Sequence, residues 1–428
     1  MFRPLFVLRT YNDIDHIVPV IWKFIKMGSS PTIIFNSSYD YKSDNRIKFL
    51  ISLGNINIIR MQDQKHEKNT IYLGSGKKFG FLKWIYVKVY NQLRKPHTSL
   101  GKIYRKLFFD CSEEYNLFKE NNFDIAIFEW GNPEMKGEIF EKIFTVAKGL
   151  GIPIFSLPHG LNVYLNSDIH QAYVSKIKKG LLPNFKPWNK YDKIIVQSKF
   201  HADHMNRFGI DDSRILVWGS ARFSPEWQEI NSSLYEEFLP SKKNNSKVNI
   251  VFMLPHWVYN VDKKNTIDLI YKISENKNLY IVIKDHTRGD TGTFPENHKE
   301  ELSNRNNIEF NAITSSTALI SWSDIVINFG SSIGLDAIYK GKAVIYPRYL
   351  HKNFTIHDIY DSAVISESST EVIEFLNKYS DNPSAIKKNN ENDLLFKTVV
   401  YGSKEPFNIL DYYYEQLISS IRKSKINE

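Results

Sequence analysis

The chain has 428 residues, 42% of them apolar and 24% charged; this composition is globular and excludes a disordered or collagen-like protein. Its single cysteine, Cys111, excludes an intramolecular disulfide framework and a cysteine-rich metal site, and it favours a reducing compartment such as the cytoplasm. One stretch, Lys77–Phe109, holds nine lysine and arginine residues and no acidic one, which accounts for the whole net charge of +9. The rest of the chain is balanced, so nucleic-acid binding is not expected.

Short apolar runs alternate with helical patterns along the first half of the chain, and this alternation predicts a parallel sheet built from βαβ units. The expected strands are Pro4–Leu8, Pro31–Phe35, Ile56–Arg60, Phe123–Phe128, Pro153–Leu157, Lys193–Gln197 and Ile215–Trp218. The expected helices are Asp15–Met27, Glu114–Glu120, Glu138–Leu150 and Phe200–Phe208.

A polar segment with two prolines, Ser224–Ser246, has the composition of an interdomain linker, and the alternation restarts after it. The expected strands there are Val248–Leu254, Leu279–Lys284, Ile308–Phe310, Asp324–Phe329 and Ala343–Tyr346. The expected helices are Lys264–Glu275, Ile333–Lys340, Thr370–Tyr379 and Ile409–Arg422.

This pattern predicts two doubly wound α/β domains, over residues 1–230 and 231–408. A last helix, within residues 409–428, is expected to pack back towards the first domain. Ligands of such sheets bind at the carboxyl ends of the strands, so the residues that follow each strand are the candidates for a site.

Two of these residues in the first domain suit proton transfer. Glu129 follows the strand Phe123–Phe128, where a carboxylate is either a positioned general base or a cap of the next helix. His159 stands between Pro158 and Gly160, which hold it at a bend. An imidazole has an ordinary pKa of about 6.5 and suits proton transfer at neutral pH. A structural turn is the alternative for His159.

The second domain offers basic side chains at comparable positions. Lys284, His286 and Arg288 share the loop after one strand, and His256 follows the strand before it. Together these groups can neutralise the charge of a diphosphate.

A small-residue turn, Gly330-Ser331-Ser332, precedes the helix expected at Ile333–Lys340. The glycine admits a ligand close to the backbone, and the serines place hydroxyl and N–H groups at a helix start, where phosphate is favoured. Asp336, one turn further on, is positioned to accept hydrogen bonds from a ribose. An ordinary N-cap serine pair is the alternative for this turn.

Three further patterns are weaker. Residues 74–78 (Gly-Ser-Gly-Lys-Lys) lack the spacing and the hydroxyl residue of a phosphate-binding P-loop. The pair Asp13 and Asp15 is of a kind that can hold a metal, but aspartate is also favoured at helix caps, and we expect a cap and no metal. His201 and His204 lack a third ligand nearby and are expected to lie on the surface.

The basic stretch Lys77–Phe109 interleaves its charges with aromatic residues. This combination suits an anionic membrane surface or a phosphate-bearing acceptor, and the alternative is a core-facing helix with a solvated basic face. The residues that we assign to acceptor or membrane contact are Lys83, Trp84, Lys88, Arg94 and Lys95. No run of 18 apolar residues occurs, so we expect a cytoplasmic protein on the inner face of the membrane rather than one that spans it.

Several of these elements resemble, in the same order, those of a known group. They are Pro158-His159-Gly160, Ile215–Arg222, Leu254–Trp257, and Gly330–Ser332 with Asp336. They resemble the CDP-glycerol glycerophosphotransferase-like group of wall teichoic acid and capsule assembly, and the last element also resembles the capsule Kdo transferases. The similarity covers about residues 123–347.

The resemblance implies a GT-B fold, in which two Rossmann-like domains face each other across a cleft. It also implies an acceptor on the first domain, a nucleotide-activated donor on the second, and His159 as the base. The chain departs from the group's pattern at Ser220-Ala221, at Thr287 and at His256, which leaves a CMP-, CDP- or UDP-linked donor open.

The resulting prediction is a metal-independent glycosyltransferase with no resident cofactor, which moves a sugar to a glycan or lipid-linked acceptor during surface polysaccharide assembly. One alternative is a polyol-phosphate transferase with a CDP-linked donor. Another is a non-hydrolysing sugar-nucleotide 2-epimerase, which needs no acceptor. A non-catalytic membrane scaffold is a third.

Overall fold

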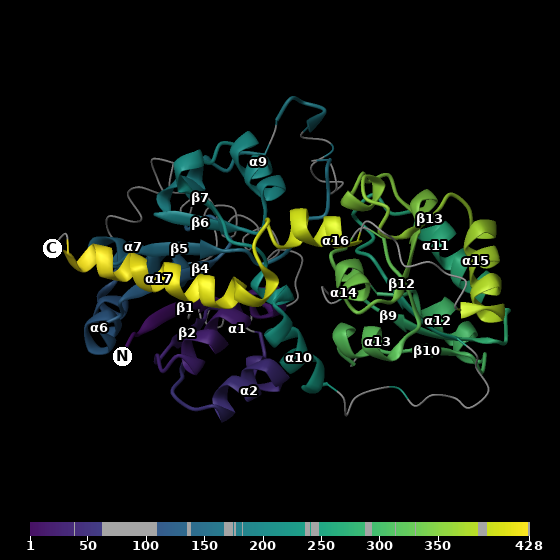
Figure 1. Cartoon of the computed structure of the whole chain (residues 1–428), viewed down its shortest axis with the longest axis horizontal. Coiled ribbons are helices and arrows are strands. Elements are labelled where there is room, and N and C mark those ends of the chain that lie inside the picture. Colours follow the sequence, from purple (N-terminus) through teal and green to yellow (C-terminus); the bar gives the residue numbers. More distant parts are fainter. Residues whose placement is uncertain are drawn as a thin grey trace, which may run out of the picture.

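The chain folds into two lobes, each built on a parallel β-sheet (Figure 1). The computed structural model describes residues 1–37, 39–61, 109–134, 138–166, 174, 177–181, 183–235, 240, 248–286, 293–312, 314–329, 331–383 and 392–426.

The first lobe contains a parallel sheet of seven described strands in the order β3-β2-β1-β4-β5-β6-β7. The strands are β1 (Pro4–Leu8), β2 (Thr32–Phe35), β3 (Asn57–Arg60), β4 (Ile125–Glu129), β5 (Ile154–Leu157), β6 (Lys193–Val196) and β7 (Ile215–Val217). Its inner strands are buried on both faces, which is why they appear in the sequence as continuous apolar runs. The strand order reverses between β1 and β4, and a crevice opens at such a point.

The second lobe contains a parallel sheet of six described strands in the order β10-β9-β8-β11-β12-β13. The strands are β8 (Val248–Met253), β9 (Leu279–Lys284), β10 (Ile308–Phe310), β11 (Ile325–Ile327), β12 (Ala343–Pro347) and β13 (Val364–Ser366). The order reverses between β8 and β11. The predicted pair of doubly wound α/β domains is confirmed.

Helices cover the sheets. In the first lobe they are α1 (Tyr11–Lys26), α2 (Asn45–Ser52), α6 (Ser112–Asn121), α7 (Glu138–Gly149), α9 (Lys199–Arg207) and α10 (Pro225–Ser233). In the second lobe they are α11 (Lys263–Ile273), α12 (Glu296–Ser303), α13 (Ser316–Trp322), α14 (Ile333–Tyr339) and α15 (Ser369–Asp381).

Two expectations about the helices are wrong. The segment Ser224–Ser246 is not linker throughout, because α10 begins at Pro225, a residue preorganised for the first helical turn. Helix α1 begins four residues earlier than predicted, because Thr10 is its N-cap and Asp13 accepts hydrogen bonds from the backbone N–H groups of Arg9 and Thr10. Asp15 therefore lies inside the helix rather than at its cap.

After α15 the chain returns to the first lobe through α16 (Asn392–Leu395) and a π-helical turn, Phe396–Val400. The last helix, α17 (Ile409–Ile426), packs along α1, as the yellow helix in Figure 1 shows. Lys23 of α1 contacts Asp411 at 2.6 Å, and the hydroxyl of Tyr413 donates to the carbonyl of Gly219 at 2.9 Å. The C-terminal helix thus ties the second lobe to the first.

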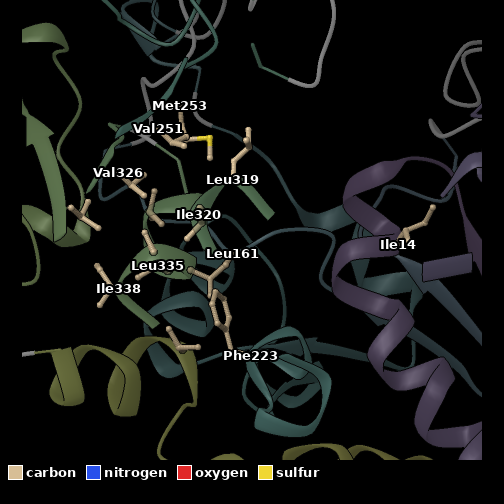
Figure 2. Packing of buried hydrophobic residues seen from close by; sticks show 14 of the residues in the cluster. Ile14, Leu161, Phe223, Val251, Met253, Leu319, Ile320, Val326, Leu335 and Ile338 are labelled. Carbon is tan, nitrogen blue, oxygen red and sulfur yellow. The ribbon is translucent and has the colours of Figure 1, made fainter. Parts of the chain in front are cut away.

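One hydrophobic cluster of buried side chains runs through both lobes. Figure 2 shows Leu161 and Phe223 of the first lobe beside Leu335 and Ile338 of the second. A second cluster, which includes Phe128 and Phe140, covers the other face of the first sheet. The lobes therefore meet through a continuous apolar core.

Candidate active site

A cleft of about 490 Å³ lies between the two lobes, at the carboxyl ends of the strands. Loops that follow β4, β5, β8 and β9 line it, together with the first turn of α1 and the residues before α14. Its walls include His159 from the first lobe and His256, Lys284 and Ser332 from the second. The predicted cleft between two facing domains is confirmed.

In the first lobe, the cleft adjoins a buried carboxylate. Glu129 is the last residue of β4 and has no exposed surface. Its Oε2 lies 3.5 Å from Nδ1 of His159, and its Oε1 accepts a hydrogen bond from Nε of Arg9 at 2.6 Å. The sequence-predicted pair is thus brought together, with Arg9 compensating the charge of the carboxylate.

A third group, Asp13, completes this cluster. Ligand atoms of Asp13, Glu129 and His159 all lie within 4.8 Å of one another. Burial and the neighbouring Glu129 carboxylate raise the pKa of Asp13, and its Oδ1 accepts no hydrogen bond from the described residues. A raised carboxyl pKa favours a neutral side chain that can donate a proton. The three side chains can therefore hold and move a proton at one end of the cleft.

The same three side chains also have the composition of a cation site. A divalent ion there would bind carboxylate oxygens and an imidazole nitrogen. Arg9 already places a positive charge 2.6 Å from Glu129, which weakens the attraction for a second cation.

The loop that carries His159 is fixed by neighbours on β6 and α9. Gln197 donates to the carbonyl of Gly160 at 2.8 Å. His201 is buried and donates from Nε2 to the carbonyl of Asn162 at 3.0 Å, which leaves Nδ1 to accept from the hydroxyl of Ser198 at 2.8 Å. Burial lowers the pKa of His201 to about 4, so the ring is neutral. The prediction of a surface His201 is wrong, because this imidazole supports the loop of the site.

The second lobe contributes nitrogen and hydroxyl groups. Lys284 ends β9, and burial lowers its pKa to about 8. The rings of His256 and His286 meet edge to face, 5.3 Å apart. Ser331 and Ser332 line the same wall, just before the short helix α14. These five predicted residues therefore face one cleft.

Asp336 is placed differently from those five. It is buried in α14, and its carboxylate accepts from Nη2 of Arg222 at 2.6 Å, while Nη1 of Arg222 contacts Asp15 at 2.8 Å. Burial raises the pKa of Asp336 to about 6 despite this partner. In this conformation, Asp336 connects the two lobes.

Some predicted residues lie outside the described part of the chain. They are Arg288, Gly330, and the five residues of the basic stretch, namely Lys83, Trp84, Lys88, Arg94 and Lys95.

Three site residues were missed by sequence reasoning, which had assigned Asp13 to a cap and gave Arg9 and Arg222 no role. For Arg9 a signal existed, because it directly follows the first strand at the carboxyl edge. Arg222 had none, since its role depends on a partner in the other lobe.

No protein-family model and no curated protein sequence matches the chain. Solved structures match it in fold. The UDP-GlcNAc 2-epimerase of Neisseria meningitidis, bound to UDP-GlcNAc, is 14% identical, with 98% of this chain and 100% of that one covered and a TM-score of 0.56. The UDP-GlcNAc 2-epimerase of Methanocaldococcus jannaschii is 14% identical, with 97% and 100% covered and a TM-score of 0.57. An Anabaena protein in complex with UDP and glucose is 10% identical, with 98% and 100% covered and a TM-score of 0.54.

At such identities the similarity shows the fold. The chain has a GT-B-type fold. This confirms the fold that the resemblance implied. The resemblance to the CDP-glycerol glycerophosphotransferase-like group and to the Kdo transferases has no support among these structures and stays a prediction.

None of the helices in the described part of the chain is both long enough and apolar enough to cross a bilayer.

Proposed function

We propose that the chain is an enzyme that acts on a nucleotide-activated sugar bound in the cleft between its lobes. The observation that carries this proposal is that the two lobes contribute different chemical groups to the cleft. His159 lines one side, with the buried carboxyl groups of Glu129 and Asp13 behind it, and groups that suit phosphate line the other. A sugar nucleotide has the matching polarity, with a diphosphate at one end and reactive sugar carbons beside it.

The phosphate side depends on Lys284, with His256, His286, Ser331 and Ser332 around it. Lys284 keeps a positive charge below its pKa of about 8, and hydroxyl groups donate to phosphate oxygens. In a partly buried cleft such charge-assisted hydrogen bonds are stronger than in water. They would hold the donor and stabilise the departing nucleotide as its charge develops.

Glycosyl transfer is one reaction that this arrangement serves. His159, oriented by Glu129, removes the proton of an acceptor hydroxyl, which then attacks the anomeric carbon while the nucleotide leaves on the side of Lys284. General-base catalysis contributes roughly 10²–10⁴ in rate. In this reading the acceptor is a glycan or lipid-linked sugar of a surface polysaccharide.

Sugar-nucleotide 2-epimerisation is the second candidate, and the fold similarity supports it at least as well, because two of the structures described above are UDP-GlcNAc 2-epimerases. Inverting a C–H centre requires a proton to leave one face and return to the other. His159 and His256 come from opposite lobes and line one cleft, which suits this requirement. Polyol-phosphate transfer from a CDP-linked donor is the third candidate, and it would use the same groups on the two sides of the cleft.

Proton NMR of UDP-GlcNAc incubated with the protein in D₂O separates these reactions. A 2-epimerase incorporates deuterium at C2 and forms the 2-epimer without any acceptor. A transferase leaves C2 protonated and consumes a donor only when an acceptor is added. CDP-glycerol serves as the probe for polyol-phosphate transfer. If no sugar nucleotide of a UDP-, CDP-, CMP- or GDP-linked panel binds or reacts, the proposal is wrong.

A further inference from the structure

A group of aromatic side chains continues the cleft beyond the reactive residues of the first lobe. We call Trp130, Phe185 and Phe208 the aromatic arm; all three line the cleft, and His204 and Met205 line it beside them. Trp130 follows Glu129 in the sequence, and Trp130 and His159 line the same cleft.

The arm is built as a connected set of rings. The centroids of Trp130 and Phe185 are 5.6 Å apart, and those of Phe185 and Phe208 are 5.5 Å apart, both edge to face. Trp188, which does not line the cleft, stacks on Trp130 with centroids 5.2 Å apart. Trp130 and Phe185 also pack against the second hydrophobic cluster, which includes Phe128. Rings held in this way lose little conformational freedom when a ligand binds.

The arm carries no formal charge at neutral pH. His204, which lines the cleft beside these rings, has a pKa lowered by burial and by Arg207, which keeps the imidazole neutral. The guanidinium of Arg207 lies 5.7 Å from the centroid of the Phe208 ring but does not line the cleft. The charged residues that line the cleft, Asp15, Arg222, Lys284 and Asp285, are not part of the arm. The arm therefore suits a neutral ligand with apolar faces rather than a phosphate.

Position then narrows the chemistry of the ligand. Because Trp130 and His159 line the same cleft, a ligand on Trp130 needs a hydroxyl group if His159 is to remove a proton from it. A pyranose ring has both features, since its C–H faces pack on aromatic rings and its edge carries hydroxyl groups. An alkyl or prenyl chain has the apolar surface without the hydroxyl groups.

We propose that the aromatic arm is a binding site for a sugar ring of a glycan acceptor, which sits on Trp130 and Phe185 and directs a hydroxyl group to His159. This inference rests on the proposed function and deepens it: it adds a second ligand, which a transferase needs and an epimerase lacks.

The test combines two probes on the full chain. An array of bacterial capsule and lipopolysaccharide fragments is screened in the presence of saturating UDP, and the strongest binder is then measured by saturation-transfer difference NMR with irradiation of the aromatic protons. UDP binding is measured separately by calorimetry. The variants are Trp130→Ala and Phe185→Ala, and the control is Phe375→Ala, a half-buried phenylalanine on α15 that does not line the cleft.

We expect saturation to reach the C–H protons of one sugar face, and each alanine variant to lose at least tenfold in glycan affinity while UDP affinity stays within twofold. Phe375→Ala should change neither. Trp130→Phe and Phe185→Tyr, which keep a ring, should retain glycan affinity within a few-fold, so these variants remain informative if an alanine variant misfolds.

Three results overturn the inference: glycan affinity unchanged in the alanine variants, no glycan bound although UDP binds, or a polyprenyl phosphate in micelles bound at the arm in place of glycans. Glycan binding that depends on Trp130 in a protein that binds no nucleotide supports the arm and contradicts the proposed function instead.

Discussion

The carboxylate of Glu129 is surrounded by side chains from three different elements. Arg9 follows β1, Asp13 lies in the first turn of α1, and His159 follows β5. Arg9 compensates the negative charge, so the carboxylate tolerates complete burial and keeps its second oxygen near the imidazole. His159, the proposed base, is thus in contact with a carboxylate that is inaccessible to solvent.

His159→Ala is expected to lower turnover by about 10²-fold or more, because it removes the group that takes the proton. UDP affinity should stay within a few-fold, since the residues proposed to bind phosphate, Lys284 and Ser332, belong to the second lobe. Steady-state kinetics and calorimetry check the two effects, and His298→Ala, on α12 outside the cleft, is the control. Unchanged turnover in His159→Ala would remove this residue from the chemistry and leave Glu129 as the base.

Lys284 should make nucleotide binding depend on pH. Burial lowers its pKa to about 8, so the ammonium is mostly charged at pH 7 and mostly neutral at pH 9. Because the charged form attracts phosphate, the affinity for UDP relative to uridine should fall about tenfold between these pH values. Calorimetry at both pH values measures this ratio. Lys284→Arg stays charged throughout and should lose the dependence, and a ratio that stays constant in the wild type would show that Lys284 does not hold the phosphates.

At the scale of elements, the chain that returns from the second lobe passes close to the backbone of the first lobe. Gly402 has φ 55°, and a Cβ there would lie 2.3 Å from the carbonyl oxygen of Gln197 and 2.7 Å from a methyl group of Val217. Gly219 faces the same segment with φ 82°. Two glycines thus let the segment before α17 approach the carboxyl ends of β6 and β7.

Gly402→Ala should lower the free energy of unfolding by about 1–3 kcal/mol more than Gly54→Ala. Gly54 has φ 72° with nothing within 4 Å of its Cβ position, so the control carries the backbone strain without the clash. Urea unfolding of both variants measures the difference. Equal losses would mean that the contact relaxes without cost.

Element positions could be predicted well, because buried parallel strands are apolar runs bounded by polar residues. The strands Pro4–Leu8 and Leu279–Lys284 match to the residue. Helices α2 and α13 were missed, since they have only eight and seven residues, too few to show a helical period. His201 was misjudged because its burial comes from Asn162 in another loop.

At the scale of the whole molecule, the site depends on pairs that no local pattern contains. Arg9 and Glu129 are 120 residues apart, and Arg222 and Asp336 are 114 residues apart. Their meeting depends on the strand order of each sheet and on how the lobes face, which periodicity does not give. Arg222, between Asp15 and Asp336, joins α1 to the helix that follows Ser331 and Ser332, and so couples the two walls of the cleft.

The basic stretch Lys77–Phe109 is expected to bring the protein to an anionic membrane. It holds nine positive charges, each worth on the order of 1 kcal/mol near such a surface. Sedimentation with vesicles of increasing anionic content should therefore show increasing binding that salt reverses. Replacing Lys83, Lys88, Arg94 and Lys95 by glutamine should abolish it. Binding that ignores lipid charge, or that survives these replacements, would contradict this role.

The central claim is that the cleft between the lobes binds a nucleotide-activated sugar. The most direct measurement is thermal unfolding with UDP, CDP, CMP and GDP and with their sugar conjugates, in the wild type and in a Lys284→Ala, Ser332→Ala double variant. A ligand at a hundredfold excess over its Kd stabilises the folded state by about 2.7 kcal/mol. We predict that one nucleotide raises the Tm of the wild type and that the double variant loses this rise while unfolding normally without ligand. If every nucleotide leaves the Tm unchanged, or if the double variant responds as the wild type does, the claim is contradicted.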